Sequence, residues 1–406
     1  MTRNDLYDAV FRYKKAGLWK KIWDTEIFAF RLRNGEIGYI SIMGKNGEFN
    51  ALGLYIGKEG IQSYKLLAQG NPPFGSPFKE HEYLLQQKCL QAALGMKDDL
   101  MPEEAEEVRA YAKAHEIKLT GKNAYPQFIK YEPCHHPWKV QSETDMEALY
   151  DALTASCLLA DMLKETSPAE LNITSINEYT ASVPLFELKN NQLLSVGRAD
   201  LPDIPAEKYE YASADNQISI AMVKKLPQAG IWDAELLLMM TPVQENPEDP
   251  PYYPTLLMIA NSRDGHLLHT SLIGENENNS QSILQNFAKA WKKEGVYPKE
   301  VRCRDERTYA LLKAFCEKTN VKISIYKGKL AALDEAQNAL LSSTENANED
   351  DLAAQLTEFA LSVLNMSKEE FALLPKPMIK ELCQLVDSGI LPKNIARKLS
   401  EKIKEL

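Results

Sequence analysis

Alternating hydrophobic and polar positions mark the clearest elements of this chain, close to its N-terminus. Two Asn-Gly pairs, Asn34-Gly35 and Asn46-Gly47, separate three strand-like runs at residues 27–32, 37–44 and 49–57. Asn-Gly supplies the positive φ angles that a tight hairpin turn requires. The pattern therefore predicts a three-stranded antiparallel meander.

Further elements complete this N-terminal lobe. A helix is predicted from Gly60 to Gln69, and another begins at Pro102, because proline followed by acidic residues suits the first turn of a helix. A strand at residues 126–133 comes next. Ser142 has the chemistry of an N-cap and predicts one more helix after it.

A second region repeats these landmarks in the same order. Residues 231–235 (Ile-Trp-Asp-Ala-Glu) resemble residues 22–26 (Ile-Trp-Asp-Thr-Glu), and each pentapeptide is expected to introduce a first strand. Asp264-Gly265 separates two further strand-like runs and is typical of a hairpin. An amphipathic helix that feeds a strand follows in both regions. These matches predict an internal duplication.

The predicted fold class is α+β. Two related lobes of mixed sheet plus helices, each in the order β-β-β-α-β-α-β, are followed by a helical C-terminal tail. The predicted domains are an N-terminal lobe, a β-rich connecting segment, a second lobe, an acidic linker and the tail, at residues 1–165, 166–227, 228–341, 342–351 and 352–406.

The last helix of the tail is amphipathic. Ile395, Leu399 and Ile403 line one face, opposite three lysines: Lys398, Lys402 and Lys404. A solvated lysine face is the simpler interpretation, and contact with an acidic partner is the alternative.

Composition narrows the class of protein. The formal net charge is −10, which argues against nucleic-acid binding through phosphates but leaves a local basic patch open. The six cysteines form no CxxC pair, as expected of thiols in a reducing compartment. No apolar run has the ~18 residues of a membrane span, and the N-terminus lacks the apolar stretch of a signal peptide. We therefore expect a cytoplasmic protein without a membrane partner.

The order of elements resembles the ribonuclease H-like fold, most clearly from Leu236 to Tyr326. In catalytic members of that fold, the resemblance implies one carboxylate in the first strand and another at the end of the fourth, which together hold divalent metals. Asp305 matches the fourth-strand position. The first-strand position falls near Ala260 and Asn261, which carry no acid.

Other carboxylates of the second lobe offer an incomplete alternative. Asp264, together with Asp334 or Glu335, would have to converge on Asp305 to hold a metal. In the first lobe, the first strand carries Arg31 and Arg33 and no acid, while Asp98 and Asp99 occupy the fourth-strand end. The resemblance therefore implies two non-catalytic lobes.

The chain also resembles an uncharacterised bacterial group that pairs two domains, the second of unknown function. The resemblance rests on the meander from Gly35 to Gly44, on Ala51-Leu52-Gly53-Leu54-Tyr55 and on Pro137-Trp138. It spans most of residues 1 to 340 and implies no activity.

Candidate sites have simple structural interpretations. Cys134-His135-His136 is the tightest group of metal-type ligands, but neighbours on an extended segment point to opposite faces, and the other histidines are scattered: His81, His115, His266 and His269. Asp305, Asp98 and Asp99 suit helix N-termini. Trp23-Asp24 and Trp232-Asp233 are expected to plug sheet ends, with paired ligand pockets as the alternative.

No nucleotide-binding, hydrolase or kinase motif is present. No catalytic, cofactor-binding or metal-binding residue is therefore assigned. The favoured hypothesis is a non-enzymatic cytoplasmic binding or adaptor protein, whose partner is expected to be a protein. A metal-dependent nuclease or phosphodiesterase that uses the carboxylates of the second lobe is the alternative.

Overall fold

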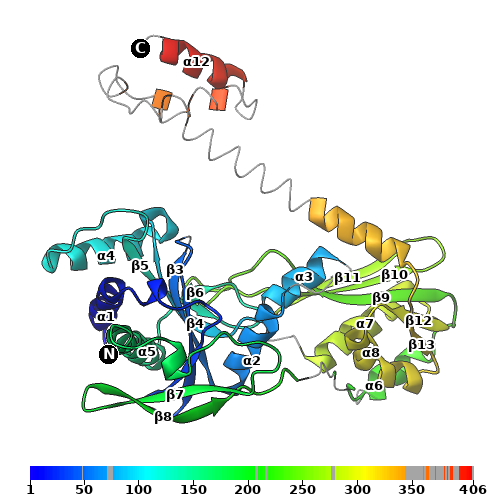
Figure 1. The fold of residues 1–406 in the computed structure, drawn as a ribbon. Coiled ribbons are helices and arrows are strands. Elements are labelled where there is room, and N and C mark those ends of the chain that lie inside the picture. The colour runs from blue at the N-terminus through cyan, green and yellow to red at the C-terminus, as the bar shows by residue number, and fades with distance from the viewer. Residues whose placement is uncertain are drawn as a thin grey trace. The chain divides into compact units, whose positions relative to one another are not determined.

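The computed structural model describes most of the chain (Figure 1). The described residues are 1–47, 49–70, 76–205, 209, 211–214, 217–275, 279–342, 360, 363–364, 371, 379, 382, 385–386 and 393–404. Within them lie two sheets and several helices, so the predicted α+β class is confirmed.

Several helices begin at residues whose side chains favour a helix N-terminus. Thr2 and Asp5 form a capping box at the start of α1, Pro102 starts α4, and Ser142 caps α5 as predicted. The helical elements are α1 (Arg3–Ala16), η1 (Leu18–Lys20), α2 (Gly57–Ala68), α3 (Pro77–Leu84), η2 (Lys97–Asp99), α4 (Pro102–Ala114), α5 (Glu143–Met162), η3 (Ala169–Leu171), α6 (Gln217–Val223), α7 (Ser280–Glu294), α8 (Glu306–Lys318), a helix at residues 331–342, and α12 (Lys393–Lys404).

Among the described residues, eight strands form the first sheet, in the order β6-β5-β4-β3-β2-β1-β7-β8. The predicted meander is its centre, and Gly35 and Gly47 have the expected positive φ angles of 89° and 79°. The strands are β1 (Phe28–Arg31), β2 (Ile37–Met43), β3 (Asn50–Ile56), β4 (Cys89–Gly95), β5 (Tyr125–Tyr131), β6 (Trp138–Lys139), β7 (Ser182–Lys189) and β8 (Gln192–Asp200).

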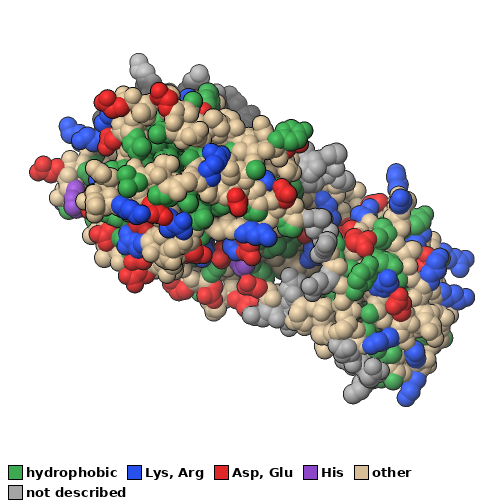
Figure 2. Space-filling model, turned by 60° about the horizontal axis from the view of Figure 1, so that its bottom comes forward, with side chains coloured by type: hydrophobic (Ala, Val, Ile, Leu, Met, Phe, Trp, Pro, Cys, Tyr) green, Lys and Arg blue, Asp and Glu red, His purple; other side chains and the backbone are tan. Residues whose placement is uncertain are grey.

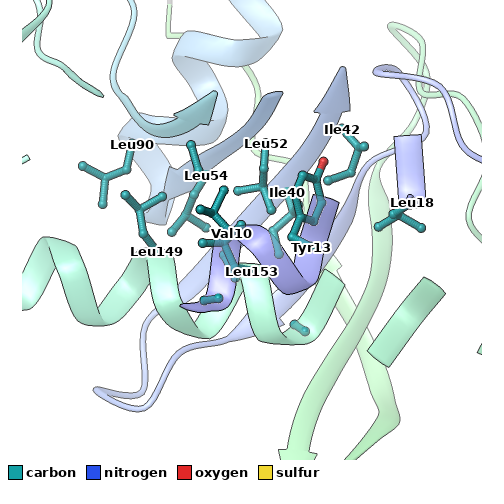
Figure 3. Packing of buried hydrophobic residues seen from close by; sticks show 14 of the residues in the cluster. Val10, Tyr13, Leu18, Ile40, Ile42, Leu52, Leu54, Leu90, Leu149 and Leu153 are labelled. Carbon is teal, nitrogen blue, oxygen red and sulfur yellow. The ribbon is translucent and has the colours of Figure 1, made fainter. Parts of the chain in front are cut away.

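Helices cover both faces of this sheet. The helices α1 and α5 pack together on one face, where Val10, Tyr13, Leu54 and Leu153 lie in a fully buried core (Figure 3). The helix α2 covers the opposite face, where a smaller cluster includes Tyr55. The first sheet is therefore the middle of three layers, with amphipathic helices on each of its two faces and apolar strand side chains pointing to both.

Five described strands form the second sheet, in the order β11-β10-β9-β12-β13. The first strand β9 pairs in parallel with the fourth strand β12, which pairs in parallel with β13. The predicted Asp264-Gly265 turn joins β10 to β11, with Gly265 at φ 74°. The strands are β9 (Ile231–Leu238), β10 (Thr255–Asn261), β11 (Leu267–Ile273), β12 (Glu300–Cys303) and β13 (Lys322–Ile325).

The predicted duplication is not confirmed, because the two sheets are connected differently. In the first sheet, the fourth strand β4 pairs antiparallel with β3, and β1 lies between β2 and β7. In the second sheet, the fourth strand pairs with the first. The strands β7 and β8, predicted as part of a connecting segment, extend the first sheet.

The chain divides into two compact units that interleave along the sequence. The first comprises residues 1–215, 236–257 and 271–287, and the second comprises residues 216–235, 258–270 and 288–406. The predicted acidic linker, apart from Ser342, lies outside the described residues.

In the described part of the tail, Ile395 and Leu399 are buried as their spacing predicts. Lys402 departs from the predicted solvated face, since its Nζ donates to the carbonyl oxygens of Val363 and Leu364 at 3.0 and 2.8 Å.

Candidate functional site

Four charged side chains lie together on one face of the second sheet. Asp233 and Glu235 on β9 are two residues apart and so point to the same face, and the parallel register places Arg302 of β12 directly opposite Asp233. Arg304 follows β12 on that same face. Trp232 points to the other face, where it packs against Trp291 of α7 with ring centroids 6.3 Å apart.

Asp233 is held by three hydrogen bonds. Arg302 donates from Nε to Oδ1 at 2.8 Å and from Nη2 to Oδ2 at 3.1 Å, and Ser262 Oγ donates to Oδ1 at 2.5 Å. Asp233 is only 2% exposed. The guanidinium of Arg302 also lies over the ring of Tyr326, 4.3 Å from its centroid. Hydrogen bonding to Asp233 raises the pKa of Arg302, so the guanidinium stays charged.

Glu235 has a matching set of partners. Arg304 Nε donates to its Oε1 at 2.9 Å, and Gln337 Nε2 donates to its Oε2 at 2.8 Å. Arg304 also donates from Nη2 to Asp334 Oδ1 at 2.5 Å. Burial by itself lowers the pKa of Arg304, but the charges of Glu235 and Asp334 outweigh it and raise the pKa. The helix at residues 331–342 supplies Asp334 and Gln337, so the network fastens this helix to the sheet.

A buried carboxylate is stable only when its charge and its lone pairs are satisfied. Both β9 carboxylates meet this condition through a guanidinium and a second, neutral donor. A guanidinium occupies the space in front of each carboxylate, where a metal ion would have to bind. The network is therefore suited to fixing strand register and helix position.

The carboxylates that the sequence suggested as a metal site do not converge in the structure, because each has a separate role or position. Asp305 caps α8, since its Oδ1 accepts from Thr308 N at 2.8 Å. Asp264 accepts from the backbone of its own hairpin turn, Asp334 pairs with Arg304, and Glu335 is exposed. Within the described part of the chain, no group of three or more metal-type ligands could hold an ion.

The predicted first-strand position was wrong. Ala260 and Asn261 end β10, which is the second strand, whereas the first strand is β9 and carries Asp233 and Glu235. The alternation Trp232-Asp233-Ala234-Glu235 was the signal for this strand. The pentapeptide at residues 231–235, predicted to introduce the first strand, lies inside β9 itself.

The two Trp-Asp pairs are not equivalent. Trp23 lies before β1, is 43% exposed and has Lys45 Nζ 4.4 Å from its ring centroid. Trp232 lies inside β9 and is 2% exposed. Paired ligand pockets at these positions are therefore not supported by the geometry.

The Cys134-His135-His136 segment makes structural contacts within the first unit. His135 Nε2 lies 3.1 Å from Glu275 Oε1, and His136 Nδ1 lies 3.1 Å from Tyr253 Oη. Cys134 has a positive φ of 63°, which turns the chain between its neighbours. The two histidines thus bond to different partners, and the segment serves as a docking point for residues 251–253.

The charged residues singled out in the first lobe are also structural. Arg33 makes a bidentate bond to the buried Asp151, with Nε and Nη2 at 3.1 and 2.5 Å from Oδ1, and Arg31 pairs with Glu187. Asp99 accepts from Met96 N at 2.6 Å in η2, beside Asp98. Arg31, Arg33 and Asp99 thus each have a partner within the first unit that explains their presence.

One shallow cavity of about 170 Å³ opens beside Lys130 in the first unit. Lys130 pairs with Glu132 and Asp145 at 3.3 and 3.1 Å. Burial lowers the pKa of Lys130, and its hydrogen bond to Asp145 reverses the effect and raises it. A lysine held charged in this way is not poised to act as a nucleophile or a base.

Two matches to protein families cover most of the chain up to the tail. Residues 4–179 match a family described as a domain of unknown function (DUF7309), and residues 219–341 match a second domain of unknown function (DUF6930). These matches are consistent with an uncharacterised two-domain family. The resemblance found in the sequence is thereby confirmed at this level, and the charged network lies wholly within the second match. A comparison with curated proteins gave no match.

Proposed function

We propose that this protein is a non-enzymatic binding or adaptor protein, and that its second sheet belongs to a non-catalytic ribonuclease H-like domain. The observation that carries the proposal is the pairing of Asp233 with Arg302 and of Glu235 with Arg304. These acids lie in the first strand, beside the fourth strand, where catalytic members of that fold hold divalent metals.

The order of elements supports the fold assignment. Residues 231–325 run through three strands, a helix, a strand, a helix and a strand, and the first and fourth strands are neighbours. Two metals can be shared between these strands only if they are adjacent, so the arrangement is the one that the resemblance requires. The first sheet lacks this adjacency.

The arginines support the absence of metal-dependent catalysis. A two-metal phosphodiesterase needs carboxylates that are free to bridge its ions. Asp233 and Glu235 are each 2% exposed and already neutralised, and displacing a guanidinium would leave a buried cation without its partner. The pairing of these carboxylates with arginines thus favours a structural role over metal-dependent catalysis.

Two further findings bear on where the protein works. The described cysteines at positions 89, 134, 157, 303 and 316 are free thiols, which fits the cytoplasmic location proposed from the sequence. In the described residues, no helix is both long and apolar enough to cross a membrane.

The test is a phosphodiesterase assay of the full chain with Mn²⁺ or Mg²⁺, on bis(p-nitrophenyl) phosphate and on labelled oligonucleotides. The proposal predicts no turnover above the metal-only blank. Turnover by the wild type that disappears in Asp233→Asn would overturn the proposal and establish the metal-dependent nuclease in its place.

A further inference from the structure

Lysines from two helices gather on one surface of the second unit. Lys289, Lys292 and Lys293 lie on the solvent-facing side of α7 and are exposed. Lys224 and Lys225 follow the end of α6 and are also exposed. Lys292 Nζ lies 3.4 Å from the sulfur of Met222, so the ends of the two helices are adjacent. We call these five lysines the α6–α7 lysine surface.

Four of the five lysines keep a positive charge that no ion pair within the described residues cancels. Among the residues that the structure describes, no carboxylate forms an ion pair with Lys224, Lys225, Lys292 or Lys293. The right-hand end of Figure 2, which holds α6, α7 and α8 in Figure 1, shows many Lys and Arg side chains and few acidic ones. The chain as a whole carries a net charge of −10, so the local excess of lysine runs against its composition.

The charge of two of these lysines affects the pKa of a neighbouring histidine. His269 lies on β11, and burial lowers its pKa, with a further lowering by the charges of Lys293 and Lys289. The two lysines therefore act at the edge of β11 as well as on their own helix.

A simpler explanation accounts for part of the arrangement. Lysines in the last turn of a helix stabilise it through the helix dipole, by about 0.3–1 kcal/mol each. This applies separately to the ends of α6 and α7. It does not require the two ends to be adjacent, and it does not account for Lys289, which lies one turn earlier. Bringing like charges together on one surface has a cost that a bound anion would remove.

We propose that the α6–α7 lysine surface binds the phosphate backbone of a nucleic acid without cleaving it. Lysine is a point charge that suits phosphate, whereas protein–protein interfaces are depleted in lysine and enriched in arginine and aromatic residues. The surface consists of lysines, and Met222 beside them is an exposed apolar residue. An acidic protein is the competing partner and is an outcome of the test.

The inference deepens the proposed binding function and rests on it. The test measures fluorescence anisotropy of labelled DNA duplex and labelled single-stranded RNA, both of mixed sequence, with the full chain over a range of KCl concentrations. The reversal variant combines Lys289→Glu, Lys292→Glu and Lys293→Glu. The matched control places three reversals on exposed lysines of the first unit: Lys58→Glu, Lys113→Glu and Lys118→Glu.

Wild type and control are expected to bind at low salt, while the reversal variant binds at least ~10-fold more weakly. Removing three phosphate contacts lowers the slope of log K against log salt by about 2.7 for duplex DNA. A milder variant with glutamine at the same three positions is expected to show the same loss of slope, which guards against misfolding of the reversal variant.

Three results would overturn the inference. These are no binding of either probe at low salt, an equal loss of binding in the control, and displacement of the probe by poly-glutamate as effectively as by unlabelled oligonucleotide. Denaturing gels of the bound probe separate this inference from the proposed function. Intact probe agrees with both, whereas bound probe that is cut would refute the non-enzymatic function and the claim of binding without cleavage.

Discussion

Replacing Arg302 with methionine tests the structural account of the charged network most sharply. The substitution keeps most of the side-chain volume and removes both guanidinium bonds, so Asp233 retains only the bond from Ser262 at 2.5 Å. Asp233 is 2% exposed, so its carboxylate would lose the guanidinium without gaining full hydration. Breaking a buried pair by removing one partner costs about 3–5 kcal/mol.

The expected result is a fall of this size in the free energy of unfolding, measured by urea denaturation. Hydrogen exchange of β9 and β12 peptides should show that the loss lies in the second sheet. The double variant that adds Asp233→Asn is expected to be more stable than Arg302→Met alone, because no unpaired charge then remains buried. Lys299→Met, at an exposed site just before β12, is the matched control and should stay within about 0.5 kcal/mol of wild type. A change below about 1 kcal/mol in Arg302→Met would refute the reasoning.

Three further predictions concern other parts of the chain. Asp305→Ala should lower stability by about 1 kcal/mol through loss of a helix cap, while Asp305→Ser should retain most of it, as urea denaturation would show. Leu153→Ala removes a fully buried side chain from the core of the first sheet and should cost about 2–5 kcal/mol in the same assay. The pKa of His269 is lowered in the folded state, so its contribution is complete above the unfolded value of about 6.5 and is lost as the pH falls below it. Denaturation at successive pH values should therefore show a smaller acid-induced loss for His269→Gln than for wild type, whereas the same substitution at the exposed His266 should behave like wild type.

Local chemistry made much of the fold predictable. The Asn-Gly turns require positive φ angles, and the alternating strands beside Gly35 and Gly47 form the expected meander. Ser142, Pro102 and Asp305 begin helices because their side chains suit that position, independently of the rest of the chain. Features set by neighbours in the sequence were thus accessible without a structure.

Features set by distant residues were not predictable. Asp233 and Glu235 can be buried on β9 because Arg302 and Arg304 neutralise their charges. These arginines lie about seventy residues later in the sequence, in and just after β12, which pairs in parallel with β9. The parallel pairing of β1 with β7 likewise joins segments that share no local signal. The similar order of elements in the two regions suggested a duplication, but order along the chain does not determine which strands become neighbours.

The measurement that tests the central claim most directly is a calorimetric titration of the full chain with Mn²⁺. If Arg302 and Arg304 neutralise the β9 carboxylates, no saturable binding is expected at millimolar or lower metal, and Asp233→Asn should behave like wild type. Stoichiometric Mn²⁺ binding that Asp233→Asn abolishes would contradict the account and identify a metal centre at this position.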